Sequence, residues 1–449
     1  MRSRAVLALL AMMAAAAHDV ASLDTDMPTN SHPGRIAVVG GGVAGCAAAI
    51  LLCAQGHQVT LFEAVADPRP VGAGLLLQPT GQAILRRLGL LDEVLAHGAP
   101  VQRLFGDNAR GRTVLDLDYG RFAPGCFGLG IQRGTLFGLL WRRMLAAGTT
   151  VRLATSVEGF AQDDAGVTLA GAGGVELGRF DALILANGSF SSLRAGMQVQ
   201  QAQAPFPWGA LWAVLPAPPG FAPVELRQRF RSAREMVGLM PVGRALDAPT
   251  GEPRGINFFW SLPLADVPAW QAGGLPAWKA RVEALMPMSA PLLESITAPG
   301  QLRVARYADV SMQRWHDRRV LAIGDAAHGM SPQLGQGANM ALIDAWVLAH
   351  CVRTARTPRG VAWNDAFAGW SDERRPHLRF YQRSSVALTP LFQSHGRVAP
   401  LLRDLFFGLP GRWSWVHQHS VAALAGLKTG WLSGRIDLAR YDPPAAAPP

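Results

Sequence analysis

The chain has 449 residues, of which 49% are hydrophobic and 16% charged, a balance typical of a globular protein of two or three domains. This composition excludes a wholly disordered chain. The four cysteines are far apart, with no CxxC pair and no histidine cluster at zinc-ligand spacing, so we expect neither a disulfide framework nor a metal site. The net charge of +10 is spread along the chain without a basic stripe, so we expect no nucleic-acid partner.

Residues 1–33 precede the first expected strand and form an N-terminal extension. Arg2, Arg4 and the apolar run 5–17 resemble a secretory signal, and the alternative is that translation begins at Met27. The apolar run is shorter than the roughly 20 residues that cross a bilayer. Because the cysteines show no disulfide pattern, we favour a mis-set start and a cytoplasmic protein, with export as the alternative.

A short β-branched run, 35–40, ends in a glycine turn that an alanine-rich stretch follows. This order of strand, turn and helix is typical of a dinucleotide-binding unit. Gly40 allows the tight turn, Gly42 lets a pyrophosphate approach the backbone, and Gly45 lets the helix pack closely on the strand. The helix N-terminus then faces the phosphates.

A second strand is expected at 57–62, and Glu63 stands at its end. An acidic side chain there can accept hydrogen bonds from both ribose hydroxyls of an adenosine. The sequence therefore predicts a dinucleotide site, although this part of the chain does not distinguish FAD from NAD(P). Its predicted binding residues are Gly40, Gly42, Val43, Ala44, Gly45 and Glu63.

The choice of FAD comes from the other end of the chain. A buried strand within 315–323 ends in Gly324-Asp325, and 330–339 leads into a long helix. This segment resembles the Gly-Asp motif of the group A flavoprotein monooxygenases, relatives of para-hydroxybenzoate hydroxylase. The resemblance implies that Asp325 holds the ribityl or ribose part of FAD.

The same resemblance implies that the loop after this motif passes close to the flavin ring. The helix N-terminus would place partial positive charge beside the ring, where reduced flavin is negative. We assign no acid or base. The predicted ring-side catalytic residues are Pro332, Gly335 and Gln336, and the predicted binding residues at the helix start are Gly337, Ala338 and Asn339.

Two further segments match the family. The run 181–194 is similar to its Asp-Gly fingerprint, with Asn187 in place of the aspartate before Gly188. Asparagine keeps the hydrogen-bonding shape without the charge, so its effect on nicotinamide use stays open. Arg133 lies at the start of an expected helix, at the position where the family has an arginine that reaches FAD.

The predicted fold is α/β: an FAD-binding, Rossmann-like domain of the glutathione-reductase type, an antiparallel β-sheet substrate domain and C-terminal helices. The FAD domain is expected to be discontinuous, over 34–196 and 302–365. The alternating strands and Pro/Gly turns of 197–301 indicate the substrate sheet. Residues 366–449 are expected to be helical, with a disordered proline-rich tail.

The resemblance implies an FAD-dependent monooxygenase with non-covalent FAD. NAD(P)H would reduce the flavin, O₂ would add to give a flavin hydroperoxide, and oxygen would pass to a hydrophobic, aromatic small molecule by hydroxylation or epoxidation. The alternatives are an FAD-dependent dehydrogenase or oxidase on the same fold, or a flavin-binding protein without turnover. We expect the aromatic C-terminal region to pack on the body of the protein. The alternatives are that it covers the substrate or contacts a membrane surface. The sequence does not predict the oligomeric state.

Overall fold

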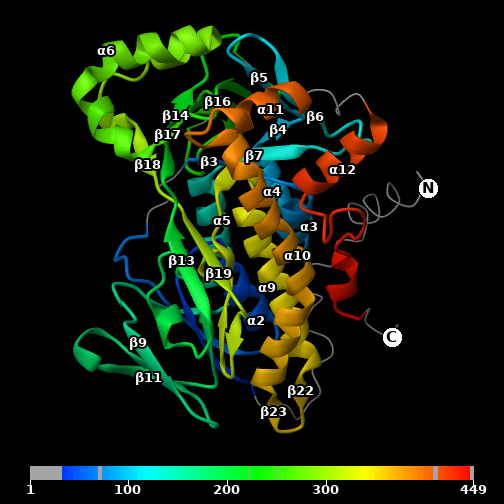
Figure 1. The fold of residues 1–449 in the computed structure, drawn as a ribbon. Coiled ribbons are helices and arrows are strands. Elements are labelled where there is room, and N and C mark those ends of the chain that lie inside the picture. The colour runs from blue at the N-terminus through cyan, green and yellow to red at the C-terminus, as the bar shows by residue number, and fades with distance from the viewer. Residues whose placement is uncertain (1–32, 69–72, 222, 250, 408–412, 445–449) are drawn as a thin grey trace.

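The computed structural model describes residues 33–68, 73–221, 223–249, 251–407 and 413–444. The extension expected over 1–33 lies outside the described residues apart from its last position, and so does the end of the expected tail, 445–449. The described chain forms two main sheets, with a bundle of long helices running beside them (Figure 1).

The first sheet has six strands and is parallel except at one edge. The first strand, β1, lies at its centre and is buried at all but its first residue, which explains the apolar run in the sequence. In spatial order the strands are β20 (His316–Asp317), β21 (Val320–Ala322), β12 (Ala182–Leu185), β1 (Arg35–Val39), β2 (Gln58–Phe62) and β8 (Thr150–Arg152).

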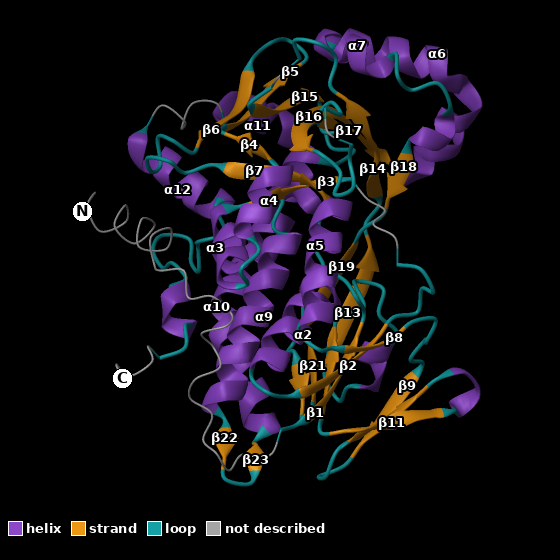
Figure 2. Cartoon of the chain, turned by 180° about the vertical axis from the view of Figure 1, so that it is seen from behind, coloured by secondary structure: helices purple, strands orange, loops and turns teal. Residues whose placement is uncertain are grey.

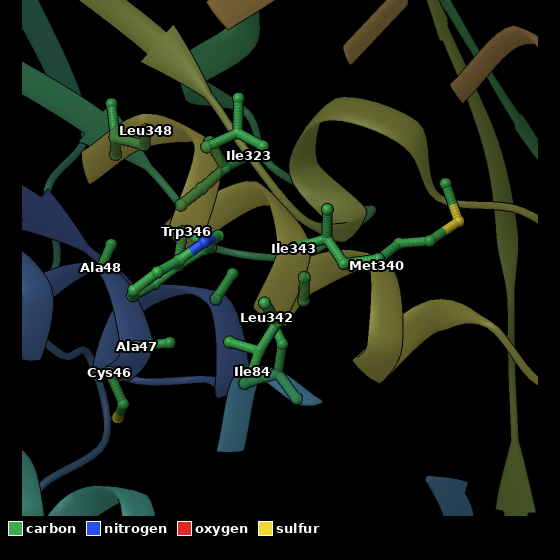
Figure 3. Packing of buried hydrophobic residues seen from close by; sticks show 14 of the residues in the cluster. Cys46, Ala47, Ala48, Ile84, Ile323, Met340, Leu342, Ile343, Trp346 and Leu348 are labelled. Carbon is green, nitrogen blue, oxygen red and sulfur yellow. The ribbon is translucent and has the colours of Figure 1, made fainter. Parts of the chain in front are cut away.

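Two helices from opposite ends of the chain pack together on this sheet. They are α2 (Val43–Ala54) and α9 (Gly337–Thr354). Small side chains such as Ala47 and Ala48 on α2 let α9 approach, and Leu342 and Trp346 of α9 fill the space between them (Figure 3). The other helices of this domain are α3 (Pro79–Arg87), α4 (Leu91–His97), α5 (Arg133–Ala146) and the short α8 (Asp325–His328).

The second sheet has seven strands and is antiparallel except where β15 pairs with β5. In spatial order they are β18 (Arg303–Ala305), β14 (Trp208–Pro216), β17 (Gly255–Pro263), β16 (Glu235–Gly243), β15 (Glu225–Arg231), β5 (Arg103–Asn108) and β6 (Thr113–Asp118). One face packs on α6 (Val267–Leu285) and α7 (Ala290–Leu293), where a separate apolar cluster includes Phe258 and Trp278.

This sheet extends beyond the range expected for it. The sequence predicted the substrate sheet within 197–301, yet β5 and β6 come from the segment assigned to the FAD domain, and β18 follows residue 301. The physical reason is the parallel pairing of β15 with β5, which joins strands more than a hundred residues apart and leaves no local pattern.

Smaller sheets complete the fold. β13 and β19 form an antiparallel ribbon beside the first sheet, as both views show (Figures 1 and 2). The bounds are β13 (Gln201–Pro205) with β19 (Ala308–Met312), β9 (Gly159–Gln162) with β10 (Val167–Ala170) and β11 (Glu176–Phe180), β3 (Gly74–Leu77) with β7 (Gly128–Gln132) and β4 (Ala99–Val101), and β22 (Arg356–Thr357) with β23 (Gly360–Val361).

The C-terminal region is helical, as predicted, but its first helix begins before residue 366. The helices are α10 (Trp363–Phe392), α11 (Val398–Phe406) and α12 (Ser414–Leu424). α10 runs along α9 and reaches the second sheet, where α11 and α12 lie beside β6 (Figure 1). Among the described residues, every helix is too short or too polar to traverse a bilayer.

Candidate active site

The glycine turn after β1 has the geometry that a dinucleotide needs. Gly40 has a φ of 105°, a conformation that favours glycine. A Cβ on Gly45 would lie 2.0 Å from the Gly40 carbonyl oxygen, whereas a Cβ on Gly42 would meet nothing within 4 Å. Gly45 therefore serves close packing, and Gly42 faces open space at the N-terminus of α2, where no side chain caps the free backbone amides.

Glu63 lies at the end of β2, next to this turn. Its Oε2 accepts a hydrogen bond from the Gly41 amide at 2.8 Å, and its Oε1 accepts one from the Val65 amide at 3.0 Å. These bonds fix the carboxylate at the rim of the cavity that the glycine turn also lines. Each oxygen keeps a lone pair that can accept a bond from a ribose hydroxyl.

The Gly-Asp turn meets the glycine turn from the opposite side. Gly324 has a φ of 59°, and a Cβ there would lie 2.8 Å from the Cβ of Ala44, so only glycine lets the two turns approach. Asp325 begins α8 with an exposed side chain on the same cavity as Glu63. The two predicted carboxylates therefore share one cavity although they are far apart in the sequence.

Asn187 follows β12 and lines this cavity. Its Oδ1 is buried and has no hydrogen-bond partner among the described residues, so it is available to a ligand. The turn is held by Arg194, whose guanidinium donates to the carbonyls of Ser189 at 2.8 Å and Ala326 at 3.1 Å. Arg194 is 2% exposed and joins the Asn187 turn to α8, a role that the sequence did not predict.

Arg133 occupies another wall of the cavity. It begins α5 and is exposed, and its guanidinium forms no hydrogen bond or ion pair with the residues that the structure describes. Tyr307 and Trp212 line the same cavity and come from the region of the second sheet. Burial raises the pKa of Tyr307 to about 12, although the charge of Arg133 acts to lower it.

One cavity of about 680 Å³ thus gathers most of the predicted binding residues. It offers helix amides, two carboxylates, and an amide oxygen and a guanidinium that have no partner in the described part of the chain, which fits the phosphates, hydroxyls and ring edge of FAD. The predicted residues on its wall are Gly40, Gly42, Val43, Ala44, Glu63, Arg133, Asn187, Gly188, Asp325, Gly337 and Ala338.

Asn339 supports this site instead of lining it. Its Oδ1 accepts from the Gln78 amide at 2.8 Å, and its Nδ2 donates to the carbonyls of Leu76 and Gly335 at 3.1 Å each. The side chain is fully buried. Asn339 therefore ties β3 to the ring-side loop, which is the segment 330–336 before α9. Its predicted direct contact with FAD stays a prediction.

The ring-side loop is held in place by the C-terminal helices. Pro332 begins a 3₁₀ turn that ends at Gly335, which has a φ of 59°. Gln336 is buried and donates from Nε2 to the Leu424 carbonyl of α12, and Ser331 Oγ lies 3.0 Å from Thr389 Oγ1 of α10. The loop conformation thus depends on helices that follow it in the sequence.

A buried charge network lies behind the Gly-Asp turn, and sequence reasoning missed it. Asp344 Oδ2 accepts from the Gly324 amide at 2.8 Å and lies 2.6 Å from His328 Nε2, while Oδ1 accepts from Arg374 Nε at 2.8 Å. Burial acts to raise the pKa of Asp344, but its cationic and hydrogen-bonding neighbours lower it overall. The signal available in the sequence was one acid in an apolar stretch of α9.

A second cavity of about 450 Å³ lies on the other side of the ring-side loop. Gln333 and Leu334 line this cavity, whereas Gly337 and Ala338 line the first one. The segment 333–338 therefore has one cavity at each end. The walls of the second cavity are largely apolar and come from the second sheet, from α10 and α12, and from the segments that follow α11 and α12. They include Phe230, Phe380, Phe392, Phe407, Trp415 and Trp431.

Comparison with known proteins agrees with this geometry. The family described as FAD binding domain matches residues 35–228 and 277–383. The 6-methylpretetramide 4-monooxygenase of Streptomyces rimosus is 30% identical over 395 residues, covering 84% of this chain and 88% of that protein. The kynurenine 3-monooxygenase of Stenotrophomonas maltophilia is 29% identical over 423 residues, or 85% of each chain.

The fold is also that of a solved oxygenase. The tetrameric form of 2-methyl-3-hydroxypyridine-5-carboxylic acid oxygenase superposes with a TM-score of 0.68 at 23% identity, covering 84% of this chain and 97% of that one. The chain belongs to the FAD-binding-domain family. Within that family it is an FAD-dependent monooxygenase of the group A type, which confirms the fold class and the enzyme class that the motifs indicated.

Proposed function

We propose that the protein uses NAD(P)H and O₂ to insert one oxygen atom into a planar, hydrophobic aromatic molecule bound in the second cavity. The observation that carries this proposal is the placement of the segment 333–338, with the FAD-side cavity at one end and the apolar cavity at the other. A substrate in the apolar cavity would lie against the loop that the family resemblance puts beside the flavin ring.

The size and chemistry of the second cavity support an aromatic substrate. Its volume of about 450 Å³ lies in the usual range for a small-molecule site, and its aromatic walls suit ring stacking. The names of the relatives point the same way, because they include kynurenine and 3-amino-4-hydroxybenzoate monooxygenases. The substrate itself follows from none of these observations.

The residues of this chain would hold FAD without a covalent bond. The free amides of α2 would bind the pyrophosphate, Glu63 and Asp325 would accept bonds from sugar or ribityl hydroxyls, and the N-terminus of α9 would stabilise negative charge on the ring. When bound, FAD supplies the electron transfer to O₂ and the oxygen transfer. The protein excludes water and orients the substrate.

Isotope labelling separates the proposal from its alternatives. The test screens the purified protein against aromatic acids and phenols, with NADH or NADPH as reductant under ¹⁸O₂. Mass spectrometry then measures the masses of the products. One ¹⁸O per product molecule supports the proposal. Product without ¹⁸O would indicate a dehydrogenase or oxidase. If the nicotinamide absorbance stays constant in every reaction, the protein binds flavin without turnover.

A pair of variants on one helix tests the cavity. Ala387 and its neighbour Val386 on α10 are both exposed, but of the two only Ala387 lines the second cavity. Ala387→Trp is expected to abolish substrate-dependent turnover while FAD stays bound. Val386→Trp adds the same side chain outside the cavity and is expected to keep activity, so equal activity of the two variants would overturn the assignment.

Three further expectations stay predictions. The cytoplasmic location and the C-terminal contact with a membrane surface are untested, although several side chains there are exposed, Trp413 and Leu432 among them. Acid precipitation tests the non-covalent binding of FAD, because non-covalent flavin is released into the supernatant.

A further inference from the structure

A buried lysine lines the second cavity without a carboxylate partner. Lys428 follows α12 and is 3% exposed. Its Nζ lies 3.2 Å from His419 Nδ1 and 3.3 Å from the Trp431 carbonyl oxygen. Within the described part of the chain, no carboxylate oxygen lies within 4 Å of this ammonium. A buried cation without an anion is costly, so it points to a ligand that supplies one.

The charges around Lys428 do not neutralise it. Arg435, which bridges to it in a short antiparallel contact, adds a second positive charge. Asp116 also lines the cavity, but it forms an ion pair with Arg103 at 2.7 Å. Burial, followed by the charge of Arg435, lowers the pKa of Lys428.

His419 is arranged as a second donor. Because Lys428 donates to Nδ1, the proton of the neutral ring lies on Nε2. Burial and then the charges of Lys428 and Arg435 lower the pKa of His419, so they disfavour the protonated ring. Trp415 packs edge-on against the imidazole with ring centroids 4.3 Å apart and limits its rotation. An ammonium and an N–H donor thus lie side by side on an aromatic wall.

We propose that Lys428 and His419 bind an oxyanion on the aromatic substrate, either a carboxylate or an ionised phenol or enol. The inference rests on the proposed function, since it takes the second cavity as the substrate site. The pair would hold the charged end of the molecule at the C-terminal wall, while the apolar walls, Leu334 of the ring-side loop among them, hold its rings. Lys428 and His419 are then specificity-determining residues.

A matched pair of probes tests the anion directly. 2-Naphthoate and 2-naphthamide share one ring system and differ in charge, and calorimetry on the FAD-loaded protein measures both affinities. We expect wild type to bind the naphthoate about tenfold more tightly than the amide. Equal affinities, or no binding of either probe, would overturn the proposal without any variant being made.

The chain offers a well-matched control, because Lys279 is its other lysine and lies on α6, away from the cavity. Lys428→Met is expected to bring the two affinities to within about twofold of each other. Lys279→Met is expected to keep the wild-type preference. A preference that survives in Lys428→Met overturns the role of the ammonium, and one that survives in His419→Asn overturns the role of the imidazole.

2-Naphthol distinguishes the two kinds of oxyanion. If the site takes an ionised phenol, bound naphthol should ionise about one pH unit or more below free naphthol, as its absorbance reports. An unshifted ionisation with a strong naphthoate preference assigns the site to carboxylates. All these measurements are of binding, so a protein that fails the ¹⁸O₂ experiment but prefers naphthoate would contradict the proposed function and not the anion site.

Discussion

The carboxylate of Asp344 accepts a hydrogen bond from the backbone amide of Gly324, with the two atoms 2.8 Å apart. The bond joins the middle of α9 to the turn that presents Asp325 to the FAD-side cavity. Because Arg374 binds the other oxygen of Asp344, α10 is tied to the same point. The cofactor turn is therefore held by two helices at once.

Removing the charge of Asp344 should destabilise the protein. Asp344→Asn leaves the fully buried Arg374 without its carboxylate, and breaking such a pair costs about 3 to 5 kcal/mol. Urea unfolding measures this loss, and the fraction of FAD retained after gel filtration should fall with it. Asp372→Asn is the control, because Asp372 pairs with Arg375 on the surface of α10 and its loss should cost under about 1 kcal/mol.

Stability should fall as the pH drops below neutrality, because His377 is buried as a neutral ring. Burial and then the charge of Arg374 lower its pKa to about 3. The unfolded chain binds a proton at this histidine below about pH 6.5, and the folded chain does not until about pH 3. The free energy of unfolding should therefore decrease by up to about 1.4 kcal/mol per pH unit in this window.

The variant His377→Gln isolates that contribution. It removes the titrating group, so the free energy of unfolding should depend less steeply on pH between 6.5 and 4, although the variant is less stable at pH 7 because the bond to the Gly426 carbonyl changes. Urea unfolding at a series of pH values checks both. Identical pH slopes for wild type and variant would show that His377 is not the group responsible.

Two glycines at the start of α2 should respond differently to alanine. Gly45→Ala puts a Cβ against the Gly40 carbonyl and should destabilise the apoprotein itself. Gly42→Ala meets no protein atom within 4 Å, so the apoprotein should keep its stability while FAD affinity falls. Thermal unfolding of the apoproteins and fluorescence titration with FAD measure the two effects. Unchanged FAD affinity in Gly42→Ala would place the pyrophosphate elsewhere.

Restoring the family's acid at Asn187 tests its role in flavin reduction. If an acidic group at this turn helps to orient the nicotinamide, Asn187→Asp should speed reduction by NAD(P)H and leave FAD binding nearly unchanged, since a misplacement of about 1 Å can cost a hundredfold in rate. Anaerobic stopped-flow absorbance measures the rate. Equal rates at saturating nicotinamide would show that Asn187 only closes the turn before Gly188.

The elements of the cofactor site could be predicted because each leaves a local pattern. The strand, glycine turn and helix around Gly40 follow from β-branched residues, a glycine that can adopt a positive φ, and small side chains, all within twenty residues. The Gly324-Asp325 turn is equally local. Their convergence on one cavity was expected from the family resemblance, and the structure places Glu63 and Asp325 on the same cavity.

Other features arise only when distant segments meet, and no local pattern marks them. β5 enters the second sheet by pairing with a strand more than a hundred residues later. Asn339, whose contact with FAD stays a prediction, binds the backbone of Gln78 and Leu76 in the structure. The spacing in the sequence predicted where Asn339 lies, but not which partners would satisfy its amide.

The sequence by itself determined the dinucleotide-binding unit, because strand-to-helix order and the glycines of a turn are set by residues that are neighbours in the chain. FAD and the enzyme class followed from the resemblance of its motifs to the group A flavoprotein monooxygenases. Only the tertiary structure decided where the second cavity lies and which charge lines it. Lys428 is an ordinary lysine in the sequence. It becomes a buried ammonium with no carboxylate partner among the described residues because α12 folds back over the second sheet and the ring-side loop. Burial and charge pairing depend on the whole fold, so they could be found only there.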